Sequence, residues 1–93
     1  MSERFLGLYR ASVVGNIDPQ RLGRVQVEVP EVLGDGQASW AMPCVPCLDP
    51  ARDLIAIPRV GMGVWVTFER GDPDYPVWMG RYFSPGEAPE PRG

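Results

Sequence analysis

The chain has 93 residues, which leaves room for one small domain, and its 11 Gly and 11 Pro are about twice the usual share. Leu, Ile, Val and Phe still make up about a quarter of the chain, which is enough for a buried core and excludes a wholly disordered protein. The net charge of −3, with 9 Arg and no Lys, argues against nucleic-acid binding, which needs clustered positive charge.

The first part of the chain predicts two paired strands. Residues 6–15 are typical of a strand, which ends at the turn sequence Asn16-Ile17-Asp18-Pro19. A second strand follows, because Val25, Val27 and Val29 alternate with polar residues and so give one buried face. The short connection between these strands favours an antiparallel hairpin.

A loop, a third strand and a helical turn are expected next. Pro30 stops the second strand, and residues 31–38 are a predicted loop. Residues 39–45 are a predicted third strand, weakened by Pro43, which belongs at an edge or a bulge. Asp49-Pro50-Ala51-Arg52-Asp53 is a helix start signal, with a capping residue followed by Pro.

Two more strands are expected towards the C-terminus. Residues 54–57 are a short extended piece, cut off by Pro58. Val64, Val66 and Phe68 then share one face of a strand. The remaining predicted segments are a tight loop over 70–76 and a last strand over 77–83.

This order predicts an all-β fold: a small five-stranded OB-fold Greek-key barrel with a short helical turn between strands 3 and 4. An SH3-like barrel is the nearest alternative. The OB-fold domain is expected over residues 1–83, and the Pro-rich tail of residues 84–93 is expected to be flexible or extended. No stretch is long and apolar enough for a signal peptide or a membrane span, so we expect a soluble protein made in the cytoplasm, without stable membrane insertion.

The segment Cys44-Val45-Pro46-Cys47 is the first candidate for chemistry. A redox motif of this type precedes a helix, whereas the context here is β, and a zinc site needs four ligands where the chain has two Cys and no His. We therefore expect Cys44 and Cys47 to be small, buried or half-buried apolar side chains, with no metal and no cofactor. A metal site or disulfide shared between subunits, and redox catalysis, are the alternatives.

Catalytic groups are scarce. Asp72 and Asp74 offer too few oxygens for calcium, so we expect them to be turn residues. The absence of His removes the usual general base and any Ser/His/Asp triad. The chain is therefore not expected to be an enzyme.

Nine aromatic residues are many for this length. OB-folds that bind single strands stack bases on such rings, but they also need a positive groove, which the acidic balance does not favour. Trp65 lies opposite the Val64, Val66 and Phe68 face, so we expect it outside, where a Trp is typical of a protein interface. The alternative is a small barrel that buries both faces in places.

Two stretches together resemble a known family. They are DPQRLGRVQVEVP, from Asp18 to Pro30, and GDPDYPVWMG, from Gly71 to Gly80, supported by Ser39-Trp40-Ala41 and Pro58-Arg59-Val60-Gly61. They resemble the N-terminal OB-fold of phage baseplate spike proteins of the baseplate assembly protein V type and of the VgrG proteins of type VI secretion. The resemblance runs from about Leu8 to Tyr82, and it is the pairing of the two stretches that is specific.

The resemblance implies a non-enzymatic structural part of a contractile tail or injection machine. In that family the OB domain is trimeric, lies beneath the tail tube, and links a ring of hub proteins to the membrane-piercing spike. It implies a homotrimer in the virion tail baseplate or an equivalent injection particle, assembled in the host bacterial cytoplasm, with hub and spike or tip proteins as partners and no nucleic acid. Relatives continue into a β-helix or a lytic domain, so this sequence leaves open whether it is the tip or an adaptor.

We expect Trp65, Trp78 and Tyr82 to contact neighbouring subunits or the hub. The apolar faces of two strands fill the barrel in this hypothesis: Val25, Val27, Val29, Val64, Val66 and Phe68. The competing interpretation is an OB-fold module that binds single-stranded nucleic acid or an oligosaccharide.

Overall fold

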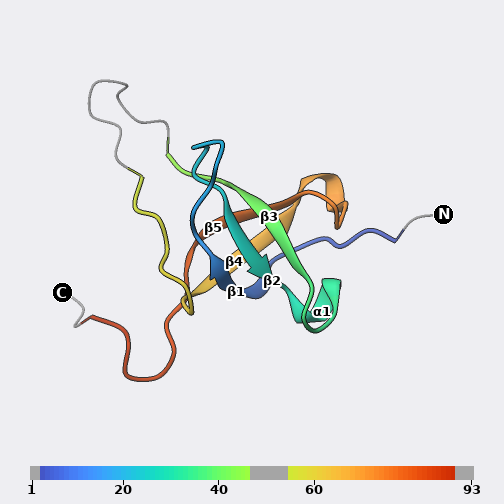
Figure 1. Ribbon diagram of the computed structural model, residues 1–93. Helices are drawn as coiled ribbons and strands as arrows, with labels where there is room; N and C mark the ends of the chain where they lie inside the picture. Colours follow the sequence, from blue (N-terminus) through green and yellow to red (C-terminus); the bar gives the residue numbers. More distant parts are fainter. Residues whose placement is uncertain (1–2, 47–54, 90–93) are drawn as a thin grey trace.

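Five strands form the framework of the computed structural model, which describes residues 3–46 and 55–89 (Figure 1). A short helix and a single 3-10 turn, η1, connect some of them. In chain order the elements are β1 (Tyr9–Gly15), β2 (Val25–Glu28), α1 (Pro30–Leu33), β3 (Ala38–Pro43), β4 (Gly63–Phe68), η1 (Glu69–Gly71) and β5 (Pro76–Arg81).

The strands close into a barrel in the order β1-β2-β3-β5-β4. The β1–β2, β1–β4, β2–β3 and β4–β5 pairs are antiparallel, and β3 and β5 are parallel. Since β4 returns to β1 and β5 lies between β3 and β4, the connections form the Greek key of an OB-fold. The predicted fold class and the predicted first hairpin are therefore confirmed.

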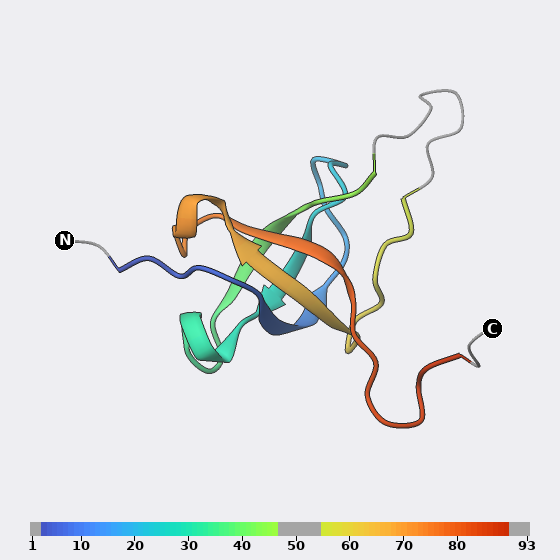
Figure 2. The same ribbon diagram turned by 180° about the vertical axis from the view of Figure 1, so that it is seen from behind.

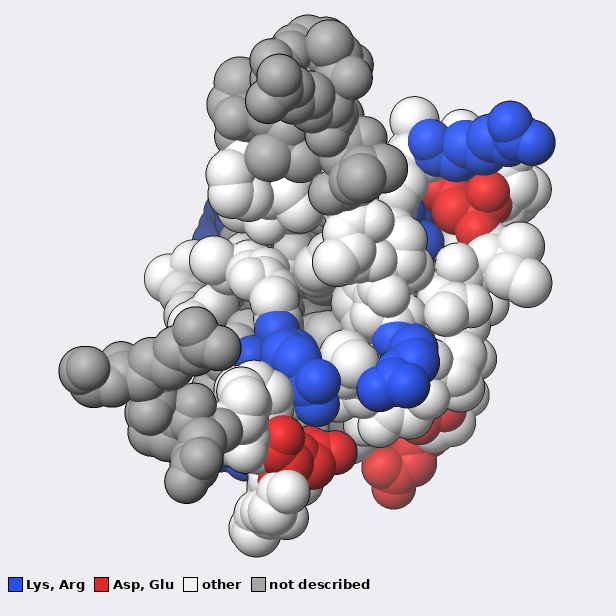
Figure 3. Space-filling model, turned by 90° about the vertical axis from the view of Figure 1, so that its left-hand side faces the viewer, with Lys and Arg blue, Asp and Glu red and all other residues white. Residues whose placement is uncertain are grey.

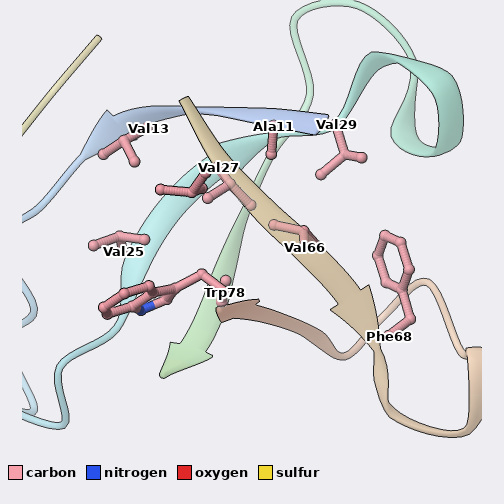
Figure 4. Packing of buried hydrophobic residues seen from close by; sticks show 10 residues of the cluster. Ala11, Val13, Val25, Val27, Val29, Val66, Phe68 and Trp78 are labelled. Carbon is pink, nitrogen blue, oxygen red and sulfur yellow. The ribbon is translucent and has the colours of Figure 1, made fainter. Parts of the chain in front are cut away.

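Alternating side chains from the strands fill the barrel (Figure 4). Each strand turns one face inward, because successive side chains point to opposite sides of a strand. All six residues expected in the core are buried, and Ala11, Val13, Ala41 and Trp78 join them. The small Val and Ala side chains suit a narrow barrel, in which Phe68 and Trp78 are the large rings among the buried residues.

The predicted loop after β2 begins with a helix, α1, so that prediction is wrong for residues 31–33. Pro30 stands in the first helical turn, where its missing N–H is no loss. The amides of Val32 and Leu33 both donate to the carbonyl of Val29, at 3.0 and 2.8 Å. Both side chains pack against the core, and this contact stabilises a helix too short to persist alone. The helical turn predicted at residues 49–53 lies outside the described residues.

The first strand begins later than expected, at Tyr9, because Gly7 takes a left-handed conformation with φ of 98°. The residues before it run along the turn between β4 and β5 instead. There the Phe5 amide donates to the carbonyl of Gly71 at 2.8 Å, and the Arg4 side chain donates to the carbonyl of Arg70 at 2.7 Å. The last strand also stops earlier than expected, at Arg81.

The strand directions give the barrel two different ends, one on the right and one on the left of Figure 1, with the two sides exchanged in Figure 2. What we call the first end carries the N-terminal segment, the connection from β2 to β3 and the turn from β4 to β5. The second end carries the β1–β2 loop, the described parts of the β3–β4 connection and the chain after β5. Within the described ranges, no helix is long and apolar enough to cross a membrane.

Candidate partner interface

A bulge in β5 decides which aromatic side chains face outward. Val64 pairs with Arg81 and Val66 with Trp78, so Met79 and Gly80 together oppose one residue of β4. Gly80 has a φ of 123°, which a residue with a side chain rarely adopts. Such an extra residue shifts the alternation of side chains by one position. Two residues whose numbers are both even, or both odd, therefore point to opposite sides of the sheet when the bulge lies between them.

Trp78 lies before the bulge and faces inward, contrary to the expectation that it contacts a partner. Its side chain is 5% exposed and lies beside the Val25 side chain in the barrel (Figure 4). The indole Nε1 donates to the carbonyl of Gly23 at 3.0 Å, which satisfies its only polar atom. Trp78 is therefore a core residue that also ties the β1–β2 loop to β5.

Tyr82 lies after the bulge and packs on the outside against Trp65, with ring centroids 5.3 Å apart. The Arg10 guanidinium lies 4.8 Å from the Tyr82 ring centroid and 5.3 Å from that of Trp65. Arg10 and Trp65 are also direct cross-strand partners of β1 and β4. We call these three residues the outer aromatic cluster; it confirms the outward orientation expected for Trp65, whose ring is half-buried.

Gly63 makes room for this arrangement. A Cβ at Gly63 would overlap the Tyr82 ring, with Cε1 and Cε2 each only 2.7 Å away. The ring therefore lies directly on the backbone of β4 and covers a residue that has no side chain. The Tyr82 amide also donates to the Gly63 carbonyl at 3.1 Å, so backbone and side chain hold the same position.

The β1–β2 loop is organised by one carboxylate. Asp18 accepts from the backbone amides of Gln20, Leu22 and Arg24 and from the Arg24 guanidinium, whose Nη2 lies 2.8 Å away. The Arg24 guanidinium, followed by these amides, holds the pKa of the Asp18 carboxyl far below its usual range. The same hydrogen bond raises the pKa of Arg24.

Arg24 also stacks on Trp40 of β3, with its guanidinium 4.7 Å from the ring centroid. This is the outer face of β2 and β3, where OB-folds that bind nucleic acid present stacking rings and positive charge. Here the Arg24 charge is matched by Asp18, and the guanidinium covers the ring. This pairing could not be predicted from the sequence, because six residues separate Asp18 from Arg24 and only the folded loop brings them together.

Asp72 and Asp74 form the turn expected of them. The Asp72 carboxylate accepts from the Asp74 amide at 3.0 Å, and the Asp72 carbonyl accepts from the Tyr75 amide at 3.0 Å. Among the described residues, no group of three or more His, Cys, Asp or Glu is arranged to hold a metal ion.

Cys44 is exposed, which corrects the expectation of a buried or half-buried side chain. It follows the last residue of β3, and its amide donates to the carbonyl of Trp78 at 2.9 Å. This hydrogen bond extends the pairing of β3 with β5 by one residue and leaves the thiol outside the barrel. Cys47 lies outside the described residues.

Comparison with known proteins gives two results. A search of curated protein sequences found no match. The sequence profile of the type VI secretion system/phage-baseplate injector OB domain matches residues 9–83, a range that spans all five strands of the barrel. The chain therefore belongs to the family of type VI secretion system and phage-baseplate injector OB domains.

Proposed function

We propose that this chain is a trimeric hub or spike protein that links the hub below the tail tube to the spike or tip of a contractile injection machine. Membership of the family gives the coarser part: a structural domain of a phage baseplate or type VI secretion injector, and hence a component of a virion or injection particle. The proposal adds the trimer, the hub and tip partners, and assembly in the bacterial cytoplasm. The observation that carries it is the outer aromatic cluster on a barrel whose core is already filled.

The outer aromatic cluster has the composition and the rigidity of a protein interface. Trp, Tyr and Arg are the residue types that contribute most to binding energy at interfaces. Tyr82 is held by Gly63 beneath it, by Trp65 beside it and by Arg10 across it. Side chains that are already ordered lose little conformational entropy when a partner covers them.

A structural role also accords with the chemistry of the described side chains. Asp18 is the carboxyl with the strongly shifted pKa, and its charge is used to bind Arg24 and the backbone of its own loop. A carboxyl that a neighbouring Arg holds ionised in this way is poorly suited to transfer protons near neutral pH. We propose that the protein works by assembly and not by catalysis.

Sedimentation velocity on the isolated protein and three single variants tests the role of the outer aromatic cluster. Trp65→Ala and Tyr82→Ala are expected to lower the fraction of trimer while the far-UV circular dichroism stays unchanged. Met79→Ala, at an exposed position of β5, is the matched control and is expected to keep the trimer. If both cluster variants assemble like the parent protein, the cluster is not the interface.

Titration with fluorescently labelled single-stranded DNA at low salt tests the competing function. We expect no saturable binding, because Arg24 on the β2–β3 face is paired with Asp18. Tight binding that weakens steeply with added salt would contradict the proposal and favour a nucleic-acid-binding module.

A further inference from the structure

Charged side chains are divided unequally between the two ends of the barrel. At the first end the described residues include seven acids and two arginines: Glu3, Glu28, Glu31, Asp35, Glu69, Asp72, Asp74, Arg4 and Arg70. At the second end they include two acids and four arginines: Asp18, Glu87, Arg21, Arg24, Arg59 and Arg81. Among the described residues, the first end is therefore negative and the second end positive.

Internal pairing accounts for both described acids of the second end. Asp18 pairs with Arg24 at 2.8 Å, and Glu87 lies 3.7 Å from Arg81. Figure 3 views the molecule from this side and shows arginines across it, with acidic side chains next to them or towards the lower edge. Arg21 and Arg59 are exposed and make no ion pair within the described residues.

The first end has a surface that would accept arginine side chains. A hollow of about 600 Å³ is lined there by residues that include Arg4, Phe5, Asp72 and Asp74. A neighbouring hollow of about 330 Å³ has Glu69, Asp74 and Tyr75 in its lining, together with Arg24, which already covers Trp40. The ring open to a partner there is Tyr75, which is 53% exposed. Carboxylates beside aromatic rings suit a guanidinium, which pairs with the first and stacks on the second.

From these observations we infer that copies of this chain associate head to tail, the acidic first end of one receiving the arginine-bearing second end of the next. The inference rests on the proposed trimer and specifies its contacts. A threefold ring requires two different surfaces on each subunit that meet each other. Two ends of opposite charge provide such a pair, whereas two identical ends brought together would repel each other.

The outer aromatic cluster adjoins the contact in this arrangement. Gly63 begins β4 and Tyr82 follows β5, so both lie at the second end, beside Arg81. The rings would supply buried contact area, and the surrounding charges would set the orientation and the rate of encounter. Interactions between such exposed charges fade over roughly 8–10 Å at physiological salt. The trimer is therefore expected to weaken with salt, on the order of tenfold or more in apparent dissociation constant between 50 and 500 mM NaCl.

Charge reversal at each end tests the inference. The first-end variant combines Asp35→Arg, Glu69→Arg and Asp74→Arg, and the second-end variant combines Arg21→Glu with Arg59→Glu; all five side chains are exposed. Each variant alone is expected to be monomeric, because the described charges of its two ends then have the same sign. The variant with all five substitutions has its polarity inverted and is expected to recover the trimer.

Controls separate charge placement from total charge and from folding. Met79→Arg adds a positive charge at an exposed position within β5, between the charged residues of the two ends, and this variant is expected to remain trimeric. Thermal unfolding and circular dichroism check that every variant is folded. Mixing the two monomeric variants is expected to produce complexes that contain both chains.

The possible results distinguish this inference from the proposed function. A trimer that is insensitive to salt and to both reversals would overturn the head-to-tail contact and leave the proposed trimer standing. A folded five-substitution variant that stays monomeric would do the same. A monomeric parent protein would overturn both.

Discussion

The contact of Tyr82 with Gly63 predicts that Gly63→Ala destabilises the parent protein but stabilises the Tyr82→Ala variant. Gly63→Ala places a methyl group where the Tyr82 ring lies, within 2.7 Å of Cε1 and Cε2. Because the β4 backbone is paired on both sides, with β1 and β5, the ring must move and the strand will not. The ring then leaves Trp65 and Arg10.

The structure gives the size of the effect. Loss of the contact between the Trp65 and Tyr82 rings costs about 0.5–1.5 kcal/mol, and loss of the Arg10 contact about 0.5–1 kcal/mol. Replacing a strand Gly by Ala returns about 0.5–1 kcal/mol, because Gly loses more backbone entropy on folding. The net free energy of unfolding should fall by roughly 0.5–1.5 kcal/mol, or about 2–10 °C in Tm for a domain of this size.

Urea unfolding followed by far-UV circular dichroism, at one fixed protein concentration, measures this effect in a double-mutant cycle. In the Tyr82→Ala background the clash is absent, so Gly63→Ala should stabilise by about 0.5–1 kcal/mol. The coupling energy between the two positions is expected to be about 1–2.5 kcal/mol. If Gly63→Ala destabilises equally in both backgrounds, the reasoning is refuted.

Three further predictions concern the core and the β1–β2 loop. Val66→Ala deletes two buried methyl groups and should lower the free energy of unfolding by roughly 2 kcal/mol, measured by urea unfolding; a cost below about 0.5 kcal/mol would show that the barrel collapses around the gap. Trp78→Phe keeps a buried ring but loses the hydrogen bond to Gly23 and should cost about 1 kcal/mol or more in the same assay, whereas an unchanged stability would show that this bond contributes nothing. Asp18→Asn should destabilise the fold at neutral pH. Because the folded-state pKa of Asp18 is depressed, its contribution is complete above the ordinary pKa of 3.8 and fades as pH falls below it. The stability difference between the parent protein and this variant should therefore shrink towards pH 2, and a difference independent of pH would contradict the role of the charge.

Alternating valines made most of the fold predictable. Val25 and Val27 in β2 and Val64 and Val66 in β4 alternate with more polar or larger residues. Because a valine recurs at every second position, both the strands and their buried faces could be inferred from the sequence. The strand ends were less predictable. Pro30 ends β2 and also begins α1, and the sequence alone favoured the first role.

The orientation of the aromatic residues was predictable only on one side of the bulge. Trp78 and Tyr82 are four residues apart and would share a face in a regular strand. The bulge at Met79 and Gly80 separates them. A Gly inside a strand often marks a bulge, so Gly80 was the one sequence signal for this change of face. The unequal distribution of the described charged residues between the two barrel ends could likewise not be predicted from the sequence, because it depends on which loops the Greek key brings together.

The mass of the isolated protein, measured by multi-angle light scattering at tens of micromolar and low salt, tests the central claim most directly. The claim is that this barrel acts by assembling with copies of itself. A trimer predicts a mass three times the 10.3 kDa of the chain. A single species at 10.3 kDa would contradict it.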